Sequence, residues 1–278
     1  MRIAGGRVAD DLRAIRVVWK RELIRFLRSR IRILTSLAQP LLFLFVLGTG
    51  LSGVVPRAPG HVDYRTFMFP GVLAMTVLFT SIFSAISIVW DREFGFMREM
   101  LVAPVRRTAL VIGKCIGGAT VSTLQGVMVL VLAGLVHVPY DPMLFLELFG
   151  MLLLTSFALT AFGVMIASRM EQVESFQMIM QFTVLPMFFL SGAVFPLTRL
   201  PSWLRVLTRI DPLSYAVEPM RRAVIHALPA SGARVLGRLD PGITWAGWHV
   251  PIAACVGVVA VFAAVSLAVA SIQFNRTD

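Results

Sequence analysis

Residues 67–89 read FMFPGVLAMTVLFTSIFSAISIV, a stretch without a single Lys, Arg, Asp or Glu. It exceeds the roughly 20 apolar residues that a helix needs to cross a hydrocarbon core of about 30 Å. It also lacks the alternation of apolar and polar residues that is typical of a strand in a membrane barrel. The stretch therefore predicts a transmembrane helix.

Five further uncharged runs, at residues 33–55, 115–136, 148–168, 175–198 and 250–275, share this character. Together the six runs predict an all-α membrane protein with one transmembrane domain over residues 1–278. Hydrophobic residues make up 57% of the chain, charged residues make up 15%, and the mean hydropathy is +0.81. Soluble domains are about 25% charged. The six predicted crossings cover residues 33–55, 67–89, 112–136, 145–168, 175–196 and 250–274.

The distribution of Lys and Arg predicts the orientation, because short loops rich in basic residues stay in the cytoplasm. Residues 1–32 hold ten basic and three acidic residues, and the link 91–114 holds five basic residues. Both segments are predicted to be cytoplasmic, and six crossings return the C-terminus to the same side. Segment 197–247 carries seven arginines, but its length makes an external position acceptable.

The net charge of +11 is interpreted as topology and as contact with anionic lipid headgroups. A nucleic-acid partner is not expected, because no soluble module has a basic face interleaved with aromatic residues. Nearly all of the 26 basic residues are arginine, which hints at a GC-rich bacterial source and hence at a bacterial inner membrane. Cys115 and Cys255 lie in apolar runs, so we expect packing residues and no metal site.

Two segments outside the crossings have a helical pattern. In residues 1–32 the apolar side chains recur every three or four positions, which predicts an amphipathic helix along the cytoplasmic leaflet, either a simple anchor or one that also touches a partner. Residues 91–107 read DREFGFMREMLVAPVRR, with Asp91 as a plausible N-cap and Pro104 as the stop. This short helix carries both apolar residues and charges of both signs, so it either docks in a groove of a partner or lies at the headgroups.

The link 91–107, together with LPMFFLSGAVFPL at 185–197, LPSWL at 200–204 and DPLSY at 211–215, resembles the ABC-2 family of ATP-binding-cassette permeases, most closely drug exporters of the daunorubicin-resistance type. The resemblance implies that the link is a coupling helix seated in a cleft of an ATP-binding subunit. It implies a polar contact for Glu93 and an apolar seat for Phe94, Phe96 and Met97. The full set of expected coupling residues is Asp91, Arg92, Glu93, Phe94, Phe96, Met97, Glu99 and Leu101.

The resemblance also implies partners: two ATP-binding-cassette subunits, which bind ATP and Mg, and a second identical or similar permease, with no cofactor on this chain. It makes the N-terminal helix a connecting helix. It further implies that residues 196–228 form short helices that dip back into the outer leaflet. In that placement five arginines would reach the outer headgroups, namely Arg199, Arg205, Arg209, Arg221 and Arg222.

The chain carries no recognisable catalytic residues. A Walker A loop needs Gly-x-x-x-x-Gly-Lys-Ser/Thr, and the nearest match, Gly113-Lys114-Cys115, lacks the first glycine and the hydroxyl. We therefore expect a transporter subunit without its own ATPase site. Lys114 and Glu147 lie about a turn from helix ends and are expected to reach the interface, so an ATP-independent carrier is the weaker alternative.

The substrate path is expected among the first, second and fifth crossings, which the resemblance places around a central cavity. Pro40 and Pro186 should bend two of these helices, as a hinge or as fixed packing geometry. The Phe- and Met-rich surfaces suit outward transport of an amphipathic drug or lipid, with a lipid-linked glycan or polysaccharide as the alternative. Candidate path residues are Gln39, Phe43, Phe79, Phe83, Gln181, Phe182 and Phe189.

Overall fold

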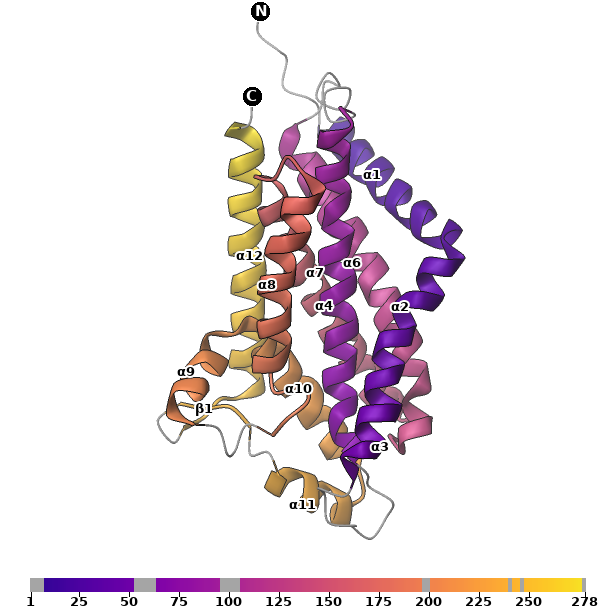
Figure 1. Cartoon of the computed structure of the whole chain (residues 1–278), viewed down its shortest axis with the longest axis vertical. Coiled ribbons are helices and arrows are strands. Elements are labelled where there is room, and N and C mark those ends of the chain that lie inside the picture. Colours follow the sequence, from indigo (N-terminus) through magenta and orange to yellow (C-terminus); the bar gives the residue numbers. More distant parts are fainter. Residues whose placement is uncertain are drawn as a thin grey trace, which may run out of the picture.

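The computed structural model describes residues 8–52, 64–95, 106–196, 201–239, 242–245 and 248–276. Six of its helices are long and apolar enough to cross a membrane, which confirms the expected all-α membrane fold. They lie along the long axis of the molecule (Figure 1). The six candidate spans are Ile33–Gly50, Tyr64–Glu93, Arg107–Val136, Pro142–Ala167, Val173–Leu190 and Ile252–Arg276.

The central helix of the bundle is α4 (Tyr64–Glu93). It is apolar around most of its circumference, which is typical of a helix that is buried on all sides. It packs against α6 (Arg107–Leu130), α7 (Pro142–Ala167) and α8 (Val173–Leu190). A Cβ atom at Gly118 of α6 would lie 2.5 Å from Cγ2 of Thr160 and 2.7 Å from Oγ of Ser84. The missing side chain therefore lets α4, α6 and α7 approach closely.

The first crossing is irregular, because Pro40 lies inside it. The crossing consists of α2 (Arg30–Leu42), a π-helical turn η1 (Phe43–Leu47) and α3 (Gly48–Gly50). Proline has no N–H to donate, and the backbone widens into the π turn just after it. Residues 53–55 of the expected crossing lie outside the described residues.

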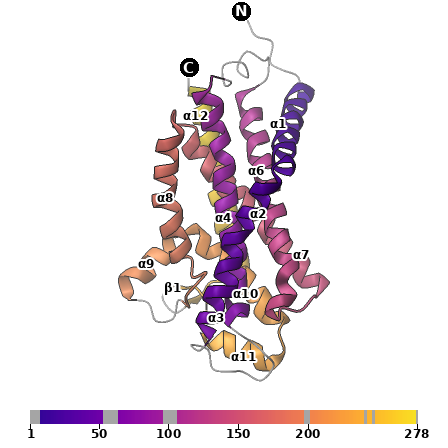
Figure 2. The same cartoon turned by 45° about the vertical axis from the view of Figure 1, so that its right-hand side comes forward.

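The expected N-terminal amphipathic helix is α1 (Val8–Arg28), and it lies along α6 (Figure 2). Its contact face carries Val18, whose Cβ would lie 3.0 Å from a Cβ atom at Gly113 of α6. Trp19 Nε1 also donates a hydrogen bond of 3.1 Å to Thr120 Oγ1. Small residues on α6 thus provide a groove that positions α1 against the bundle.

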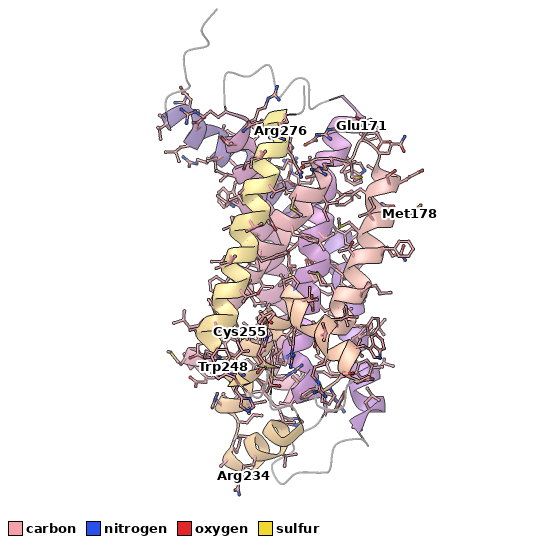
Figure 3. All side chains as sticks on the ribbon, turned by 90° about the vertical axis from the view of Figure 1, so that its left-hand side faces the viewer. Glu171, Met178, Arg234, Trp248, Cys255 and Arg276 are labelled. Atoms are coloured by element: carbon pink, nitrogen blue, oxygen red, sulfur yellow. The ribbon has the colours of Figure 1, made fainter. Side chains whose placement is uncertain are left out.

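The two ends of the bundle differ. α1 and the last turn of α12 (Ile252–Arg276) lie at one end, which we call the α1 end (Figure 1). The other end, the α11 end, carries α9 (Ser202–Ile210), α11 (Ala230–Leu239) and the antiparallel pair of β1 (Thr244–Trp245) and β2 (Trp248–His249). α6 continues towards this end as the 3-10 turn η3 (Val131–Val136). Arg276 and Arg234 mark the two ends in Figure 3.

α10 (Pro212–Ala227) enters the bundle and packs against α4, α7 and α12. Arg221 is only 2% exposed; it donates a hydrogen bond to the carbonyl oxygen of Gly192, and its guanidinium lies 4.4 Å from the ring centroid of Phe67. Arg222 Nε lies 2.6 Å from Oε1 of buried Glu218. The expectation that Arg221 and Arg222 reach the headgroups is therefore wrong, because Arg221 is buried against Gly192 and Phe67, and Arg222 pairs with Glu218 of the same helix. Arg199 lies outside the described residues.

Asp211 begins α10 and is itself buried. Its carboxylate accepts hydrogen bonds from the backbone N–H of Leu213 and of Ser214, both at 3.2 Å, and from the Ser214 hydroxyl at 3.0 Å. Burial raises the pKa of Asp211 to about 7, although these three hydrogen bonds favour the ionised form. The pKa of the residue that caps α10 thus lies in the neutral range.

Candidate functional site

The start of the expected coupling helix belongs to α4. Asp91, Arg92 and Glu93 form the last turn of that helix, so the prediction that Asp91 is the N-cap of a separate helix is wrong. The chain leaves α4 through a turn in which the Phe94 N–H bonds to the Trp90 carbonyl, and Gly95 has a left-handed φ of 80°. Phe94 is 69% exposed at the α1 end. The other expected coupling residues, Phe96, Met97, Glu99 and Leu101, lie outside the described residues.

Arg92 and Glu93 connect the end of α4 to the loop between α7 and α8. Arg92 Nη1 donates to the carbonyl oxygens of Ser168 and Met170, at 2.9 and 3.0 Å. Glu93 Oε2 accepts a hydrogen bond of 3.0 Å from the backbone N–H of Val173, the first residue of α8, where a negative charge is favourable. These two side chains therefore fix the position from which the link 94–106 departs.

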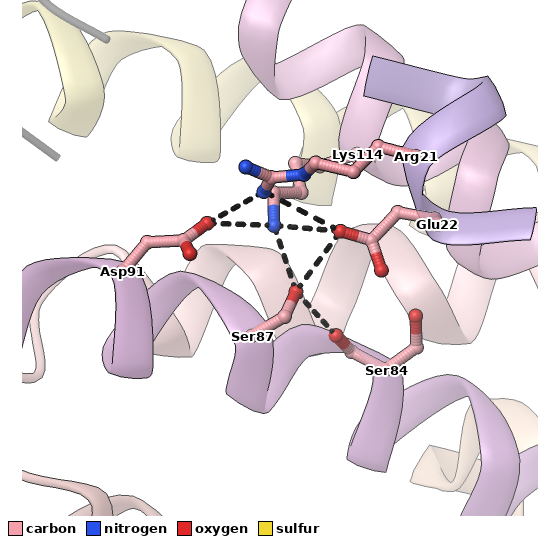
Figure 4. Close-up of polar contacts among 6 residues, drawn as sticks. All are labelled: Arg21, Glu22, Ser84, Ser87, Asp91 and Lys114. Carbon is pink, nitrogen blue, oxygen red and sulfur yellow. Dashed lines mark hydrogen bonds and ion pairs between the residues drawn. The ribbon is translucent and has the colours of Figure 1, made fainter. Parts of the chain in front are cut away.

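Asp91 belongs to a buried ion cluster that joins α1, α4 and α6 (Figure 4). Lys114 Nζ lies 2.8 Å from Glu22 Oε1, 3.0 Å from Asp91 Oδ2 and 2.8 Å from Ser87 Oγ. Arg21 Nη2 lies 2.8 Å from the same oxygen of Asp91. We call Arg21, Glu22, Ser87, Asp91 and Lys114 the junction cluster.

The expectation that Lys114 reaches the membrane interface is wrong. Its side chain is 7% exposed, and the Glu22 and Asp91 side chains are each 6% exposed. A lysine near a helix end normally extends towards water, but here two carboxylates supply its charge partners inside the protein. Burying an unpaired cation is energetically costly, and the two bonded carboxylates offset that cost for Lys114.

Sequence reasoning missed the junction cluster because its members are far apart in the chain. One signal was available: Glu22 lies on the buried face of α1, four residues after Val18 and four before Phe26. An acidic residue on such a face requires a buried partner. The identity of that partner, 92 residues away on α6, depends on the packing of α1 and is not visible in the sequence.

A cavity of about 360 Å³ opens beside the junction cluster, between α1, α2, α4, α6 and α8. Three of the expected path residues line it: Gln39, Phe79 and Phe83. Its wall combines aromatic and aliphatic surface with amides and hydroxyls, as binding pockets for amphipathic molecules do. The full lining is Glu22, Arg25, Phe26, Ser36, Gln39, Pro40, Thr76, Phe79, Thr80, Phe83, Ser84, Ile86, Ser87, Trp90, Val121, Gln125 and Gln177.

The other four expected path residues lie outside this lining. Phe43 packs edge-on against Phe188, with ring centroids 5.6 Å apart. Gln181, Phe182 and Phe189 lie on an exposed side of α8, where Phe182 is 79% exposed. Within this single chain the cavity combines residues of the first and second crossings with Gln177 of the fifth, and α1 and the third crossing, which were not expected there, line it as well.

Comparisons with known proteins agree with this architecture. A family model described as ABC-2 type transporter matches residues 13–225. The putative transport permease ycf38 of Cyanophora paradoxa is 28% identical over 218 residues, which cover 76% of this chain and 74% of the relative. Nodulation protein J of Rhizobium meliloti (strain 1021) is 30% identical over 208 residues, which cover 73% of this chain and 78% of the relative. Nodulation protein J of Rhizobium leguminosarum bv. trifolii is 29% identical over the same length.

Proposed function

Because the chain belongs to the ABC-2 type transporter family, we propose that it is the membrane-spanning permease subunit of an ATP-driven exporter for an amphipathic, drug-like or lipid-like substrate. A membrane subunit of this family is a component of a transporter and has no ATPase domain of its own. The energy then comes from ATP-binding-cassette subunits, two of them beside a second copy of this or a similar permease. The membrane is the bacterial inner membrane, with both termini in the cytoplasm.

The observation that carries the proposal is the position of the cavity next to the junction cluster. Glu22 and Ser87 belong to both. The cluster in turn joins α1 and α6 to Asp91, three residues before the exposed Phe94. A partner that displaces Phe94 therefore acts on an ion-paired junction that is also part of the cavity wall. Substrate enters the cavity from the cytoplasm or inner leaflet and leaves on the far side.

A glycan-bearing lipid is the second candidate substrate, and the amides in the cavity favour it. Gln39, Gln125 and Gln177 line the cavity together with serine and threonine hydroxyls, and such groups hydrogen-bond sugar hydroxyls as well as drug amides. Stimulation of ATP hydrolysis by a lipid-linked glycan, but not by amphipathic drugs or simple lipids, would select this candidate.

The test of the proposed function is co-purification with an ATP-binding subunit, followed by measurement of ATP hydrolysis. Phe94→Ala is the decisive variant, because the Phe94 side chain is exposed, whereas Glu93 also bonds to α8. We expect Phe94→Ala to weaken association and substrate-stimulated hydrolysis about tenfold, the effect of losing an aromatic anchor of about 1.4 kcal/mol. Glu93→Ala should lower both as well.

The matched control is Phe195→Ala, which removes an exposed phenylalanine that follows α8 at the opposite end of the bundle. It should leave association and hydrolysis unchanged. If Phe94→Ala and Phe195→Ala behave alike, the coupling role is wrong. Transport that continues without any ATP-binding subunit and follows an ion gradient would favour the ATP-independent carrier.

A further inference from the structure

Among the described residues that line the cavity, two are charged, Glu22 and Arg25. The Glu22 carboxylate is bound to Lys114 at 2.8 Å, and it also accepts a hydrogen bond of 3.5 Å from Ser87. In the junction cluster the cations Arg21 and Lys114 balance the anions Glu22 and Asp91. The charge of Arg25 is therefore additional to a cluster that is already neutral.

Arg25 lacks a complete set of hydrogen bonds in the part of the chain that the structure describes. Its Nη1 atom is buried and has no hydrogen-bond partner. A buried donor of a cation without an acceptor is unfavourable, and a guanidinium pairs best with a planar or tetrahedral oxyanion. Gln125, on the same cavity wall, likewise has a buried Oε1 atom without a donor, although its Nε2 bonds to Ser36. The cavity therefore offers a cationic donor and a neutral acceptor that no described residue satisfies.

We propose that Arg25 binds the oxyanion, a phosphate or carboxylate, of an anionic amphipathic substrate. The apolar part of the ligand then lies along Phe79, Phe83 and Ile86, and a hydroxyl of the headgroup donates to Gln125 Oε1. This inference rests on the proposed function for the cavity as a substrate site, and it narrows the substrate class to amphiphiles with a negative headgroup. Arg25 is then a specificity-determining residue.

The position of Arg25 agrees with entry from the inner leaflet. Arg25 is in the last turn of α1, just before the chain turns into α2 and the first crossing. This point lies between the α1 end and the middle of the bundle in Figure 2. The headgroup of an inner-leaflet lipid is thus brought to a cation while its chain faces apolar side chains of α4.

Binding to the purified full chain in uncharged detergent tests the inference without any ATP-binding subunit. The probes are 1-acyl lysophosphatidic acid and the matching 1-monoacylglycerol, both with a dibrominated chain that quenches nearby tryptophan. They differ only by the phosphate. Trp90 lines the cavity, and quenching that disappears in Trp90→Phe is assigned to this site. We expect the phosphate to improve the wild-type dissociation constant at least tenfold, the ratio that corresponds to about 1.4 kcal/mol.

Arg25→Gln should reduce this preference to within twofold, while Arg25→Lys retains most of it. The matched control is Arg28→Gln, which removes an exposed arginine from the same helix outside the cavity lining and should keep the full preference. A preference that survives Arg25→Gln, or that falls equally in Arg28→Gln, overturns the inference. Arg25→Lys guards against loss of folding, because it keeps the charge and the apolar stem.

Free glycerol 3-phosphate distinguishes a lipid headgroup from a soluble phosphate. We expect it to compete at least a hundredfold more weakly than lysophosphatidic acid, because it lacks the chain. Equal competition would overturn the assignment to an amphiphile. These readouts are separate from ATP-driven export. An exporting complex whose permease has no preference for the phosphate contradicts this inference alone. A permease that prefers the phosphate but neither associates with an ATP-binding subunit nor exports at the expense of ATP contradicts the proposed function alone.

Discussion

Lys114 pairs with two buried carboxylates, so removing its charge should lower the stability of the protein. Lys114→Met keeps the apolar stem and deletes the charge, leaving Glu22 and Asp91 buried with only the partly exposed Arg21 beside them. Removing one partner of a buried ion pair typically costs about 3–5 kcal/mol. We expect a loss of this size in thermal unfolding of the detergent-solubilised protein.

Lys20→Met is the matched control for this variant, because Lys20 is an exposed lysine on α1. It should change stability by less than about 0.5 kcal/mol. Adding Glu22→Gln to Lys114→Met should recover part of the loss, since it removes one of the two unpaired anions. Equal effects of Lys114→Met and Lys20→Met would show that the junction cluster does not stabilise the protein.

The raised pKa of Asp211 predicts a pH dependence with a definite sign. The folded protein holds this proton up to about pH 7, whereas the unfolded chain releases it near 3.8. Between these values the folded state binds more protons, so stability is highest at the acidic side and decreases as the pH rises to about 7. The difference is roughly 4 kcal/mol at most, from 1.36 kcal/mol per pKa unit.

Asp211→Asn separates this effect from the other titrating groups. Asparagine still caps α10, because its side-chain oxygen accepts the N–H bonds that Asp211 accepts. The variant should show a flatter dependence of melting temperature on pH between 4.5 and 7.5 than the wild type. An unchanged slope would contradict the raised pKa.

At the scale of elements, Glu93 of α4 caps the N-terminal end of α8. Its carboxylate accepts the Val173 N–H at 3.0 Å, so Glu93→Ala should fray the first turn of α8 at a cost of about 0.5–2 kcal/mol. Hydrogen exchange of the amides at 173–176 measures this directly. The control Glu147→Ala removes an exposed glutamate of α7 and should leave that exchange unchanged; if both variants exchange alike, Glu93 does not cap α8.

The helices of the bundle were predictable from the sequence. The extension of α4 to Glu93 and the entry of α10 into the bundle were not. Uncharged runs identify the crossings because lipid excludes charge over about 20 residues. α4 nevertheless continues to Glu93, because Arg92 bonds to carbonyl groups after α7 and Glu93 bonds to the first N–H of α8. α10 enters the bundle because Glu218 pairs with Arg222 and the Gly192 carbonyl accepts from Arg221. Such pairs depend on tertiary contacts, which hydropathy does not encode.

The candidate site was also predictable only in part. Gln39, Phe79 and Phe83 line the cavity, and their role in a substrate path stays a prediction. Gln181, Phe182 and Phe189 are predicted path residues of the fifth crossing, but they lie on an exposed side of α8, outside the cavity lining. Which side of a transmembrane helix faces a cavity depends on its rotation in the bundle, and that rotation is set by packing against the neighbouring helices.

For the whole molecule, the proposed coupling requires the α1 end to lie on the cytoplasmic face of the membrane. Cysteine labelling decides this, because the native Cys115 and Cys255 are buried and are readily replaced by alanine. Phe94→Cys and Arg234→Cys then place single exposed thiols at opposite ends of the bundle. In intact spheroplasts a membrane-impermeant maleimide should label Arg234→Cys at once and Phe94→Cys only after permeabilisation. This asymmetry follows from the basic residues of segment 1–32 and of the short link 91–114, which outweigh the seven arginines of the long segment 197–247. Labelling of Phe94→Cys in intact spheroplasts would place the turn after α4 beyond the reach of any cytoplasmic ATP-binding subunit, and the proposed coupling would fail with it.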